Sequence, residues 1–386
     1  MDVAVSGIVA PGFEVVKAAF EENFTSRGEL GAQVTIFYRG ELVVDLVGGL
    51  KSSTKNSPFT SDTLVNVYSV GKAILGLLAL QQIDQGAIAL DEPLANFWPE
   101  FAAFGKQKTT VRMALCHQAG VPAIDQLLSN NDLEDWDTMA CALANTKPWH
   151  EPGTAHAYHT NTYGHLIGEI VRRSSGRGVH LVLGDAMKDL GAEIYVGLAE
   201  DLIERCADIE FTSPLDPSTL QLGERTDESS MALRSYFNPP GYSSMGLVNT
   251  TRWRRCVVPS TNMHATAKGV ATFYRALLQP NTLVSSQLLA EATSVQSEGF
   301  CPILGEVATF GLGFTPTTSR RPLGPNPNSF GHFGTGGALG FCDPTAQIAF
   351  GYVMNQVTPR WQSTRNAALR TATYGAVDAL EHRSLI

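Results

Sequence analysis

A serine and a lysine three positions apart, Ser69 and Lys72, are the residues of this sequence best suited to catalysis. Residues three apart on a helix share a face, so the two side chains can meet. If a helix begins at Ser69, its dipole and free N–H groups favour negative charge near the serine oxygen. Burial against the apolar residues after Lys72 would favour a neutral amine, which can take the hydroxyl proton near neutral pH. The pair therefore predicts a serine nucleophile with a lysine base, an arrangement suited to acyl transfer.

The spacing Ser-x-x-Lys is weak evidence alone, because Ser52 and Lys55 repeat it. That second pair lies in a polar stretch that ends at Pro58, with no apolar run behind it, so it is interpreted as a solvated loop. For Ser69, the structural alternative is a helix N-cap, with Lys72 as an ordinary surface residue. Both interpretations of Ser69 stay open on this segment, and the other motifs must decide between them.

A tyrosine, Tyr158, follows the turn residues Pro152 and Gly153 in the middle of the chain. Behind it, apolar residues between Leu166 and Val171 recur at helical spacing. A turn followed by such a helix would place the phenol at the edge of a cleft, near Ser69 if the helices pack together. The phenol could then relay a proton between nucleophile and leaving group. A lone tyrosine is more often a half-buried packing residue, so this role depends on the other motifs.

Glycines crowd the stretch 330–341, just before the apolar, strand-like stretch 347–354. So many glycines imply a backbone that another group approaches closely. The backbone N–H of Thr335 could pair with that of Ser69 to form an oxyanion hole. The structural alternative is a plain glycine-rich hairpin. A phosphate loop is not favoured, because no Gly-Lys-Ser or Gly-Lys-Thr follows.

Together these motifs resemble the serine β-lactamase-like, penicillin-recognising superfamily, and most closely the class C β-lactamase-like esterases called family VIII carboxylesterases. Tyr158 follows Ser69 by 158 − 69 = 89 positions, and the glycine motif lies near the C-terminus, as in that family. Further segments that look like the family are 29–34, 45–49, 115–121 and 310–314. The resemblance covers nearly the whole chain. It implies an α/β fold (an α+β sandwich) in which helices flank an antiparallel sheet that carries a large, mainly helical insertion.

Two departures from the class C pattern favour an esterase over a β-lactamase. The chain has Tyr158-His159-Thr160 in place of Tyr-x-Asn, and His332-Phe333-Gly334 in place of Lys-Thr-Gly. A neutral histidine gives no fixed positive charge for a substrate carboxylate, and Thr160 lacks the amide that would hold a β-lactam side chain. A literal Tyr236-Phe237-Asn238 is interpreted as a loop, because two prolines follow it. Neither Ser-Asp-Asn nor Gly-x-Ser-x-Gly occurs, so a class A β-lactamase and an α/β-hydrolase are not favoured.

Composition agrees with a compact enzyme that acts on a small molecule. The 386 residues are 44% hydrophobic and 17% charged, which allows a large core. The net charge of −9 argues against nucleic acid and against an anionic membrane surface as partners. The N-terminus has neither a basic region nor a long apolar run, so we expect no signal peptide and no membrane anchor. The sequence leaves open a homo-oligomer.

The cysteines and histidines predict neither a disulfide framework nor a metal site. The six cysteines show no Cys-x-x-Cys spacing, so we interpret them as reduced thiols of a cytoplasmic protein. His156, His159 and His165 cluster in sequence, but no paired cysteines and no His-Glu-x-x-His helix accompany them. We therefore expect no metal and no cofactor.

The order of elements predicts an interrupted α/β domain. We expect a helix at 13–23, followed by strands at 32–38 and 41–47 that the Arg39-Gly40 turn joins. In the C-terminal third we expect strands at 311–315, 338–343 and 348–354 and a final helix at 362–381. The middle is mostly helical, with helices after Ser69, after Thr162 and at 179–190. We predict one discontinuous domain of residues 1–66 and 266–386. Residues 67–265 would form a mainly helical domain that carries the nucleophile, with the active site between the two. The loops of 201–262 are expected to shape the acyl pocket.

The sequence therefore predicts a serine hydrolase that cleaves short-chain esters through an acyl-enzyme on Ser69. Lys72 and Tyr158 would take and return the proton, and the N–H groups of Ser69 and Thr335 would hold the oxyanion. Substrate-binding residues are expected at His332, Phe333, Gly334 and Thr160, and Phe310, Phe314 and Phe333 imply an apolar pocket for short acyl chains. An acyltransferase or a weak β-lactamase would use the same site. A catalytically silent binding or assembly protein is the alternative from another class.

Overall fold

A hairpin of two long strands begins the main sheet. In the computed structural model, which describes residues 4–213, 222, 225, 228–358 and 363–383, β2 (Gly31–Tyr38) pairs antiparallel with β3 (Glu41–Ser52). The turn residues Arg39 and Gly40 have φ angles of 51° and 83°, the positive values that a two-residue hairpin turn requires. The predicted hairpin is confirmed, although β3 continues to Ser52 instead of ending at Val47.

Strands from the two ends of the chain share one antiparallel sheet. Its order is β1-β3-β2-β14-β13-β12-β11, and β4 pairs with the end of β3. The remaining bounds are β1 (Val5–Val9), β4 (Ser57–Pro58), β11 (Thr315–Pro316), β12 (Phe330–Phe333), β13 (Leu339–Asp343) and β14 (Ile348–Met354). The predicted strands at 338–343 and 348–354 are thus confirmed, and β2 lies directly beside β14.

The predicted strand at 311–315 is wrong except for its last residue. Gly313 has a φ of 84°, which an extended strand does not allow. A Cβ atom at Gly313 would lie 2.8 Å from the Cα of Gly76, so two backbones pass each other closely at this point. This stretch therefore packs against a helix instead of joining the sheet.

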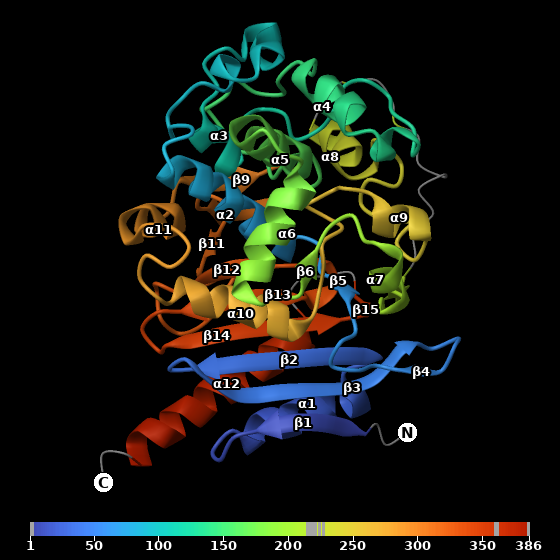
Figure 1. Cartoon of the computed structure of the whole chain (residues 1–386), viewed down its shortest axis with the longest axis vertical. Helices are drawn as coiled ribbons and strands as arrows, with labels where there is room; N and C mark the ends of the chain where they lie inside the picture. The colour runs from blue at the N-terminus through green and yellow to red at the C-terminus, as the bar shows by residue number, and fades with distance from the viewer. Residues whose placement is uncertain (1–3, 214–221, 223–224, 226–227, 359–362, 384–386) are drawn as a thin grey trace.

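Helices cover both faces of the sheet. α10 (Ala267–Leu277) packs on β14 and β2, while α1 (Glu14–Ser26) packs against α12 (Thr364–Arg383), which runs behind the sheet in Figure 1. α1 and α12 confirm the helices predicted at 13–23 and 362–381.

The region between the two groups of strands is largely helical, and it lies above the sheet in Figure 1. Its helices are α2 (Val70–Asp84), α3 (Val111–Leu115), α4 (Trp136–Ala144), α5 (Thr162–Ser175), α6 (Val179–Leu190), α7 (Glu200–Glu204), α8 (Glu228–Phe237) and α9 (Thr251–Arg255), with α11 (Ser286–Thr293) after α10. Short 3-10 helices are η1 (Leu94–Asn96), η2 (Pro99–Gly105), η3 (Asp132–Glu134) and η5 (Thr335–Gly337). α2, α5 and α6 confirm the three predicted helices.

Small sheets complete the structure. β5 (Val65–Asn66), β8 (His264–Ala265) and β6 (Ile194–Tyr195) form one, β9 (Ser297–Cys301) and β10 (Glu306–Phe310) form a hairpin, and β7 (Glu210–Phe211) pairs in parallel with β15 (Gln356–Val357). The interpretation of Tyr236-Phe237-Asn238 as a loop is wrong, because Tyr236 and Phe237 close α8. Pro239 and Pro240, which follow, end α8 but do not prevent it from forming.

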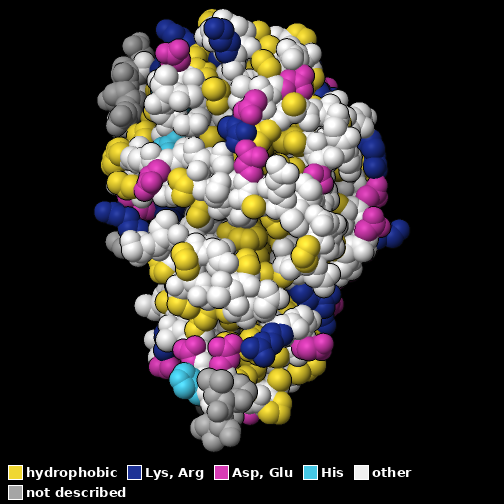
Figure 2. All heavy atoms as spheres, turned by 90° about the vertical axis from the view of Figure 1, so that its left-hand side faces the viewer, with side chains coloured by type: hydrophobic (Ala, Val, Ile, Leu, Met, Phe, Trp, Pro, Cys, Tyr) yellow, Lys and Arg dark blue, Asp and Glu magenta, His cyan; other side chains and the backbone are white. Residues whose placement is uncertain are grey.

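The predicted fold class is confirmed: an antiparallel sheet flanked by helices, with a large, mainly helical region inserted between its strands. The exact division into residues 1–66 with 266–386 and residues 67–265 stays a prediction. No helix among the described residues is long and apolar enough to cross a membrane. On the face shown in Figure 2, acidic and basic side chains are interspersed, and hydrophobic side chains gather in a hollow at mid-height.

Candidate active site

Ser69 is the residue that precedes the first turn of α2. Its side chain makes no capping hydrogen bond to the helix, so the interpretation of Ser69 as a simple N-cap is wrong. Tyr68, just before it, has a φ of 49°, which is rare for a bulky residue and marks a strained turn. The hydroxyl of Ser244 donates to the phenol of Tyr68 at 3.3 Å, which helps to hold this turn. The serine hydroxyl is thereby left available for other partners.

Lys72 is buried beside that hydroxyl, with only 1% of its surface exposed, so it is not the surface lysine of the structural alternative. Its Nζ lies 3.0 Å from the Oγ of Ser69, 2.6 Å from the carbonyl oxygen of Thr160 and 3.1 Å from that of Ser260. Among the described residues, no carboxylate forms an ion pair with it. Burial therefore lowers the pKa of Lys72 well below its ordinary value.

The two carbonyl groups decide where the lone pair of a neutral Lys72 points. A neutral amine has two hydrogens and one lone pair, whereas a carbonyl oxygen can only accept hydrogen bonds. The carbonyls of Thr160 and Ser260 therefore take the two hydrogens. The lone pair is left for the hydroxyl hydrogen of Ser69. This is the arrangement that a base needs in order to remove that proton.

Tyr158 completes the group of polar side chains around Ser69. Its ring centroid lies 4.9 Å from the Nζ of Lys72, and the ring stacks on Phe310 at 5.7 Å. Burial raises the pKa of the phenol, and a hydrogen bond to Ser69 opposes that rise. The phenol consequently keeps its proton at neutral pH, in contact with the serine oxygen.

Two buried histidines, His117 and His159, to which the sequence analysis gave no role in the site, fix the turn that carries Tyr158. The backbone N–H of His159 donates to Nδ1 of His117 at 3.1 Å, and that of Ala157 donates to the His117 carbonyl at 3.1 Å. His159 in turn donates from Nδ1 to the Ala157 carbonyl at 2.7 Å and accepts the Val121 N–H at Nε2, at 3.3 Å. Burial lowers the pKa of both rings, that of His159 to about 3. Both are therefore neutral, as these acceptor roles require.

The second carbonyl partner of Lys72 comes from a loop that sequence reasoning had expected only to shape the acyl pocket. The hydroxyl of Ser260 donates to the Asn161 carbonyl at 2.7 Å, and that of Thr261 donates to the Asn161 side chain at 2.7 Å. A Cβ atom at Gly164 would lie 2.7 Å from the Ser260 Oγ, so only glycine allows α5 to pass this loop so closely. Asn161 thus ties the start of α5 to Ser260.

The glycine-rich motif at 330–341 forms the side of the site that the sheet contributes. A Cβ atom at Gly334 would lie 2.4 Å from the Val67 carbonyl oxygen, so the end of β12 touches the backbone just before Ser69, as the run of glycines predicts. His332 donates from Nδ1 to the Phe333 carbonyl at 2.7 Å, and burial lowers the pKa of its ring to about 3. His332 is therefore a neutral, weakly basic part of the site.

The backbone N–H groups of Ser69 and Thr335 face no backbone acceptor within the described part of the chain. Both residues line the same cavity. Behind Thr335, the first turn of α12 holds the motif: Arg365 donates to the Gly336 carbonyl at 3.1 Å, and Asn366 to the Gly337 carbonyl at 2.9 Å. The backbone of this motif is thereby fixed next to Ser69.

A cavity of about 80 Å³ joins the predicted residues. Its lining residues are Ser69, Tyr158, Thr160, Tyr236, Leu304, Thr315, Arg321, His332, Phe333, Gly334 and Thr335. Every predicted site residue lines it except Lys72, which lies beneath Ser69. The expected apolar pocket of three phenylalanines is wrong in part, because only Phe333 lines the cavity, while Phe314 packs on Phe330 and Phe310 stacks on Tyr158.

Sequence reasoning missed four lining residues: Tyr236, Leu304, Thr315 and Arg321. Only the literal Tyr236-Phe237-Asn238 triplet gave a signal for any of them. The alternative pair does not form a site. Lys55 has 68% of its side chain exposed and pairs with Asp208 at 2.9 Å, whereas Ser52 bonds to Thr54.

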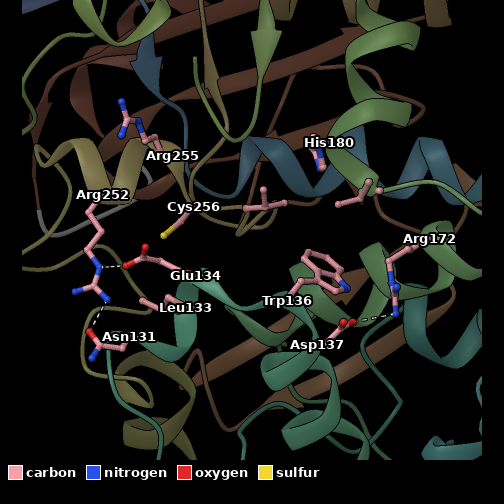
Figure 3. Close-up of a pocket in the computed structure, with 13 residues that line it drawn as sticks. Asn131, Leu133, Glu134, Trp136, Asp137, Arg172, His180, Arg252, Arg255 and Cys256 are labelled. Carbon is pink, nitrogen blue, oxygen red and sulfur yellow. Dashed lines mark hydrogen bonds and ion pairs between the residues drawn. The ribbon is translucent and has the colours of Figure 1, made fainter. Parts of the chain in front are cut away.

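A larger groove of about 820 Å³ lies elsewhere and contains none of the predicted residues (Figure 3). Ion pairs run along its walls: Arg172 pairs with Asp137 at 3.3 Å, and Arg252 pairs with Glu134. No group of three or more His, Cys, Asp or Glu side chains in the described ranges could hold a metal ion. The chemistry of the small cavity, and not the size of the groove, therefore identifies the candidate active site.

Comparison with known proteins gives consistent matches over nearly the whole chain. A family model described as Beta-lactamase matches residues 16–374. Esterase/beta-lactamase LipL of Mycobacterium tuberculosis is 26% identical over 370 residues, which cover 92% of this chain and 83% of LipL. The crystal structure of a family VIII carboxylesterase has a TM-score of 0.88 at 32% identity, and that of a penicillin-binding protein homologue from Caulobacter crescentus has 0.87 at 34%. Each of these two covers 97% of this chain and 100% of its own.

Proposed function

The chain belongs to the Beta-lactamase family, and on that premise we propose that it is a carboxylesterase that cleaves short-chain esters through an acyl-enzyme on Ser69. Membership of this family, with esterase relatives and a family VIII carboxylesterase as a structural neighbour, makes the protein a serine hydrolase. The observation that carries the proposal is the pair of carbonyl groups that turn the lone pair of Lys72 toward Ser69.

Acylation begins with the transfer of a proton from Ser69 to Lys72. The 3.0 Å contact between Oγ and Nζ allows this transfer as the oxygen attacks the ester carbonyl. Lys72 becomes an ammonium, whose third hydrogen then points at the ester oxygen of Ser69. The carbonyls of Thr160 and Ser260 stabilise this charge, because both already accept hydrogen bonds from the amine.

The negative charge that develops on the oxygen of the attacked ester carbonyl must be stabilised by hydrogen-bond donors. The N–H groups of Ser69 and Thr335 are the proposed oxyanion hole, since both line the cavity and neither donates to a backbone acceptor in the described ranges. Ser69 lies at the start of α2, so the helix dipole adds to their effect.

The leaving alcohol must receive a proton, and Tyr158 is the group placed to pass it on. Its phenol contacts Ser69 and lies close to Lys72. The proton that Lys72 took from Ser69 can therefore reach the alkoxide through the phenol, which stays neutral before and after the step. Attack of water on the acyl-enzyme reverses these roles and frees Ser69.

Labelling and a panel of esters test the proposal together. A fluorophosphonate probe should modify Ser69 in the folded protein, and a Ser69→Ala control should take up none. Among p-nitrophenyl esters of rising acyl length, short chains should have the highest kcat/KM. A cavity of about 80 Å³ is small beside the roughly 300 Å³ and above of typical small-molecule pockets. A clear preference for long acyl chains, or unlabelled Ser69 in folded protein, would contradict the proposal.

A further inference from the structure

The hairpin of β9 and β10 packs against the short segment that carries Tyr158. It contacts this segment at three points: the ring of His156, the backbone of Tyr158 and the ring of Tyr158. The proposed mechanism needs the phenol of Tyr158 at a fixed place between Lys72 and the leaving alcohol. We propose that the hairpin, through the thiol of Cys301, positions this phenol for proton transfer to the leaving alcohol. This inference rests on the proposed esterase function.

The backbone of the hairpin fixes where the sulfur of Cys301 lies. Side chains alternate along β9, so Cys301 is fully buried while its neighbour Phe300 is 61% exposed. The carbonyl of Cys301 accepts the N–H groups of Leu304 at 3.2 Å and of Gly305 at 2.8 Å, which closes the turn into β10. Gly305 has a φ of 67°, a value that favours glycine. Cys301 is thus both the end of β9 and the start of the turn.

Three consecutive backbone N–H groups around Tyr158 are held by two residues from distant segments. Those of Ala157 and His159 donate to His117, one to its carbonyl and the other to its Nδ1. The N–H between them, that of Tyr158, donates to the Sγ of Cys301 at 3.2 Å. His117 therefore fixes the two neighbours of Tyr158, and Cys301 fixes Tyr158 itself.

The thiol of Cys301 is suited to this acceptor role. It forms no disulfide, and burial raises its pKa, so it stays protonated and uncharged at neutral pH. A neutral thiol is a weak acceptor. Because the residue is fully buried, no water competes for the bond. Without the sulfur, the buried N–H of Tyr158 would lose its partner, which costs more free energy than the bond itself supplies.

The same hairpin also supports the ring of Tyr158. Phe310, at the end of β10, stacks on this ring with the centroids 5.7 Å apart and the planes 9° apart. His156 donates from Nε2 to the carbonyl of Gly299 in β9 at 3.0 Å, which ties the start of the segment to the hairpin. The backbone and the ring of Tyr158 thus depend on one hairpin. A shift of the hairpin would move the phenol relative to Ser69.

The leaving group decides how strongly the reaction depends on the place of this phenol. An alkoxide is a poor leaving group and needs a proton as its bond to the acyl carbon breaks. p-Nitrophenolate is a stable anion and depends on that proton far less. Ethyl butyrate and p-nitrophenyl butyrate form the same butyryl-enzyme on Ser69. Changes in the ratio of their kcat/KM values, ethyl ester over p-nitrophenyl ester, therefore report proton transfer to the leaving group.

Removal of the sulfur tests the inference. In Cys301→Ala the ratio should fall by about tenfold, a part of the roughly hundredfold to ten-thousandfold that a well-placed proton-transfer group contributes. Cys301→Ser keeps an acceptor and should recover part of the ratio. In the Tyr158→Phe background, Cys301→Ala should leave the ratio unchanged, because the phenol that it positions is already absent. Cys342→Ala is the matched control and should also leave the ratio unchanged, since Cys342 is equally buried but lies in β13, between β12 and β14.

An equal loss for both esters in Cys301→Ala would overturn the inference, because it would give the thiol a purely structural role. An unchanged ratio in the folded variant, or a further fall in the Tyr158→Phe background, would overturn it too. If Cys301→Ala does not fold, the same outcomes apply to Cys301→Val, which fills the space but accepts no hydrogen bond.

The wild type separates this inference from the proposed function. Hydrolysis of the p-nitrophenyl ester without hydrolysis of the ethyl ester would overturn the inference, because no proton transfer to an alkoxide would then occur. Failure of the wild type on both esters would instead overturn the proposed esterase function.

Discussion

The amine of Lys72 is buried in the protein interior, where a charged group would be unfavourable. It is 1% exposed and has no acidic partner among the described residues, yet its nitrogen makes three hydrogen bonds. Burial of a charge costs free energy unless a counter-charge offsets it, so burial lowers the pKa of Lys72 and favours the neutral form, which can act as a base. The same burial that destabilises an ammonium thereby prepares Ser69 for attack.

Substitution of the three reacting side chains should separate their roles. Ser69→Ala removes the nucleophile and should abolish turnover of p-nitrophenyl butyrate. Lys72→Ala and Tyr158→Phe should each lower kcat by about a hundredfold or more, which is the range for general acid–base groups. Ser52→Ala is the matched control, because Ser52 bonds to Thr54 and its lysine partner faces solvent. Activity retained in Ser69→Ala and lost in Ser52→Ala would show that the nucleophile is the other serine.

The pH dependence of stability should reveal the buried amine. In the unfolded chain, Lys72 binds a proton at any pH below its ordinary pKa of 10.5, whereas in the folded chain it does so only far below that pH. Between these two values the unfolded state binds more protons, so the stability of the wild type rises with pH. Lys72→Met lacks this group. The free energy of unfolding of the wild type, minus that of Lys72→Met, should therefore rise by about 1.4 kcal/mol per pH unit.

Urea unfolding of the two proteins at several pH values below 10.5 measures this difference. The other buried titratable groups are common to both proteins, so subtraction removes their contribution. Parallel stability curves would mean that Lys72 stays charged in the folded protein, which would refute its role as a neutral base.

At the scale of elements, the site depends on three close contacts, in each of which one segment passes another at a glycine. The end of β12 touches the residue before Tyr68 at Gly334, α5 passes the Ser260 loop at Gly164, and α2 passes the 311–314 stretch at Gly76 and Gly313. Each position would bring a Cβ atom to 2.4–2.8 Å from a neighbouring atom, closer than side chains pack. These glycines set how closely the sheet approaches the start of α2.

Gly334→Ala should therefore impair catalysis through the backbone alone. Its Cβ atom would lie 2.4 Å from the Val67 carbonyl oxygen, so β12 must move away from Ser69. A displacement of roughly 1 Å costs about a hundredfold in rate, so kcat should fall by that order. Gly184→Ala in α6 is the matched control, because nothing lies within 4 Å of its added Cβ. Equal activity of the two variants would show that the approach of β12 does not position the oxyanion donors.

At the scale of the whole molecule, the size of the site separates an esterase from a β-lactamase. The cavity of about 80 Å³ accepts a small acyl group, but a bicyclic β-lactam would have to remain at its mouth. His332 is neutral, and Asn161, the asparagine nearest to Tyr158 in sequence, donates its amide hydrogens to the Ser235 carbonyl and the Ser243 hydroxyl. A β-lactam would thus lack two of the contacts that class C enzymes give it.

Nitrocefin should consequently be turned over weakly, while p-nitrophenyl butyrate is hydrolysed readily. Each missing charged or buried hydrogen bond is worth about 1.5–3 kcal/mol, or one to two powers of ten in rate. Comparison of kcat/KM for the two substrates on one preparation checks this. Penicillins or cephalosporins turned over as efficiently as the ester would reassign the protein as a β-lactamase.

The sequence predicted those parts of the molecule that local rules determine. One turn of helix was enough to pair Ser69 with Lys72, and apolar patterns located β14 and α6 at their observed bounds. It did not reveal Ser260, which meets Lys72 across 188 positions of sequence, or Arg321, which enters the cavity from a loop. Contacts of this kind depend on how segments that are distant in sequence pack together, and the hydrophobic periodicity of the sequence does not predict them. The short edge strand β1 was missed for the same reason, since only its pairing with β3 defines it.

The link between α12 and the glycine-rich motif has a consequence for how the enzyme is made. Arg365 and Asn366 hold the carbonyls of Gly336 and Gly337, beside the proposed oxyanion donor Thr335. A ribosome produces Ser69 before Arg365, by 365 − 69 = 296 residues. On the proposed mechanism, a nascent chain would already carry its nucleophile and its base but would still lack the two side chains that hold the backbone beside the donor Thr335. The oxyanion hole would therefore be fixed only once α12 has been made, and a message cut short before α12 would yield a serine that turns over an ester poorly.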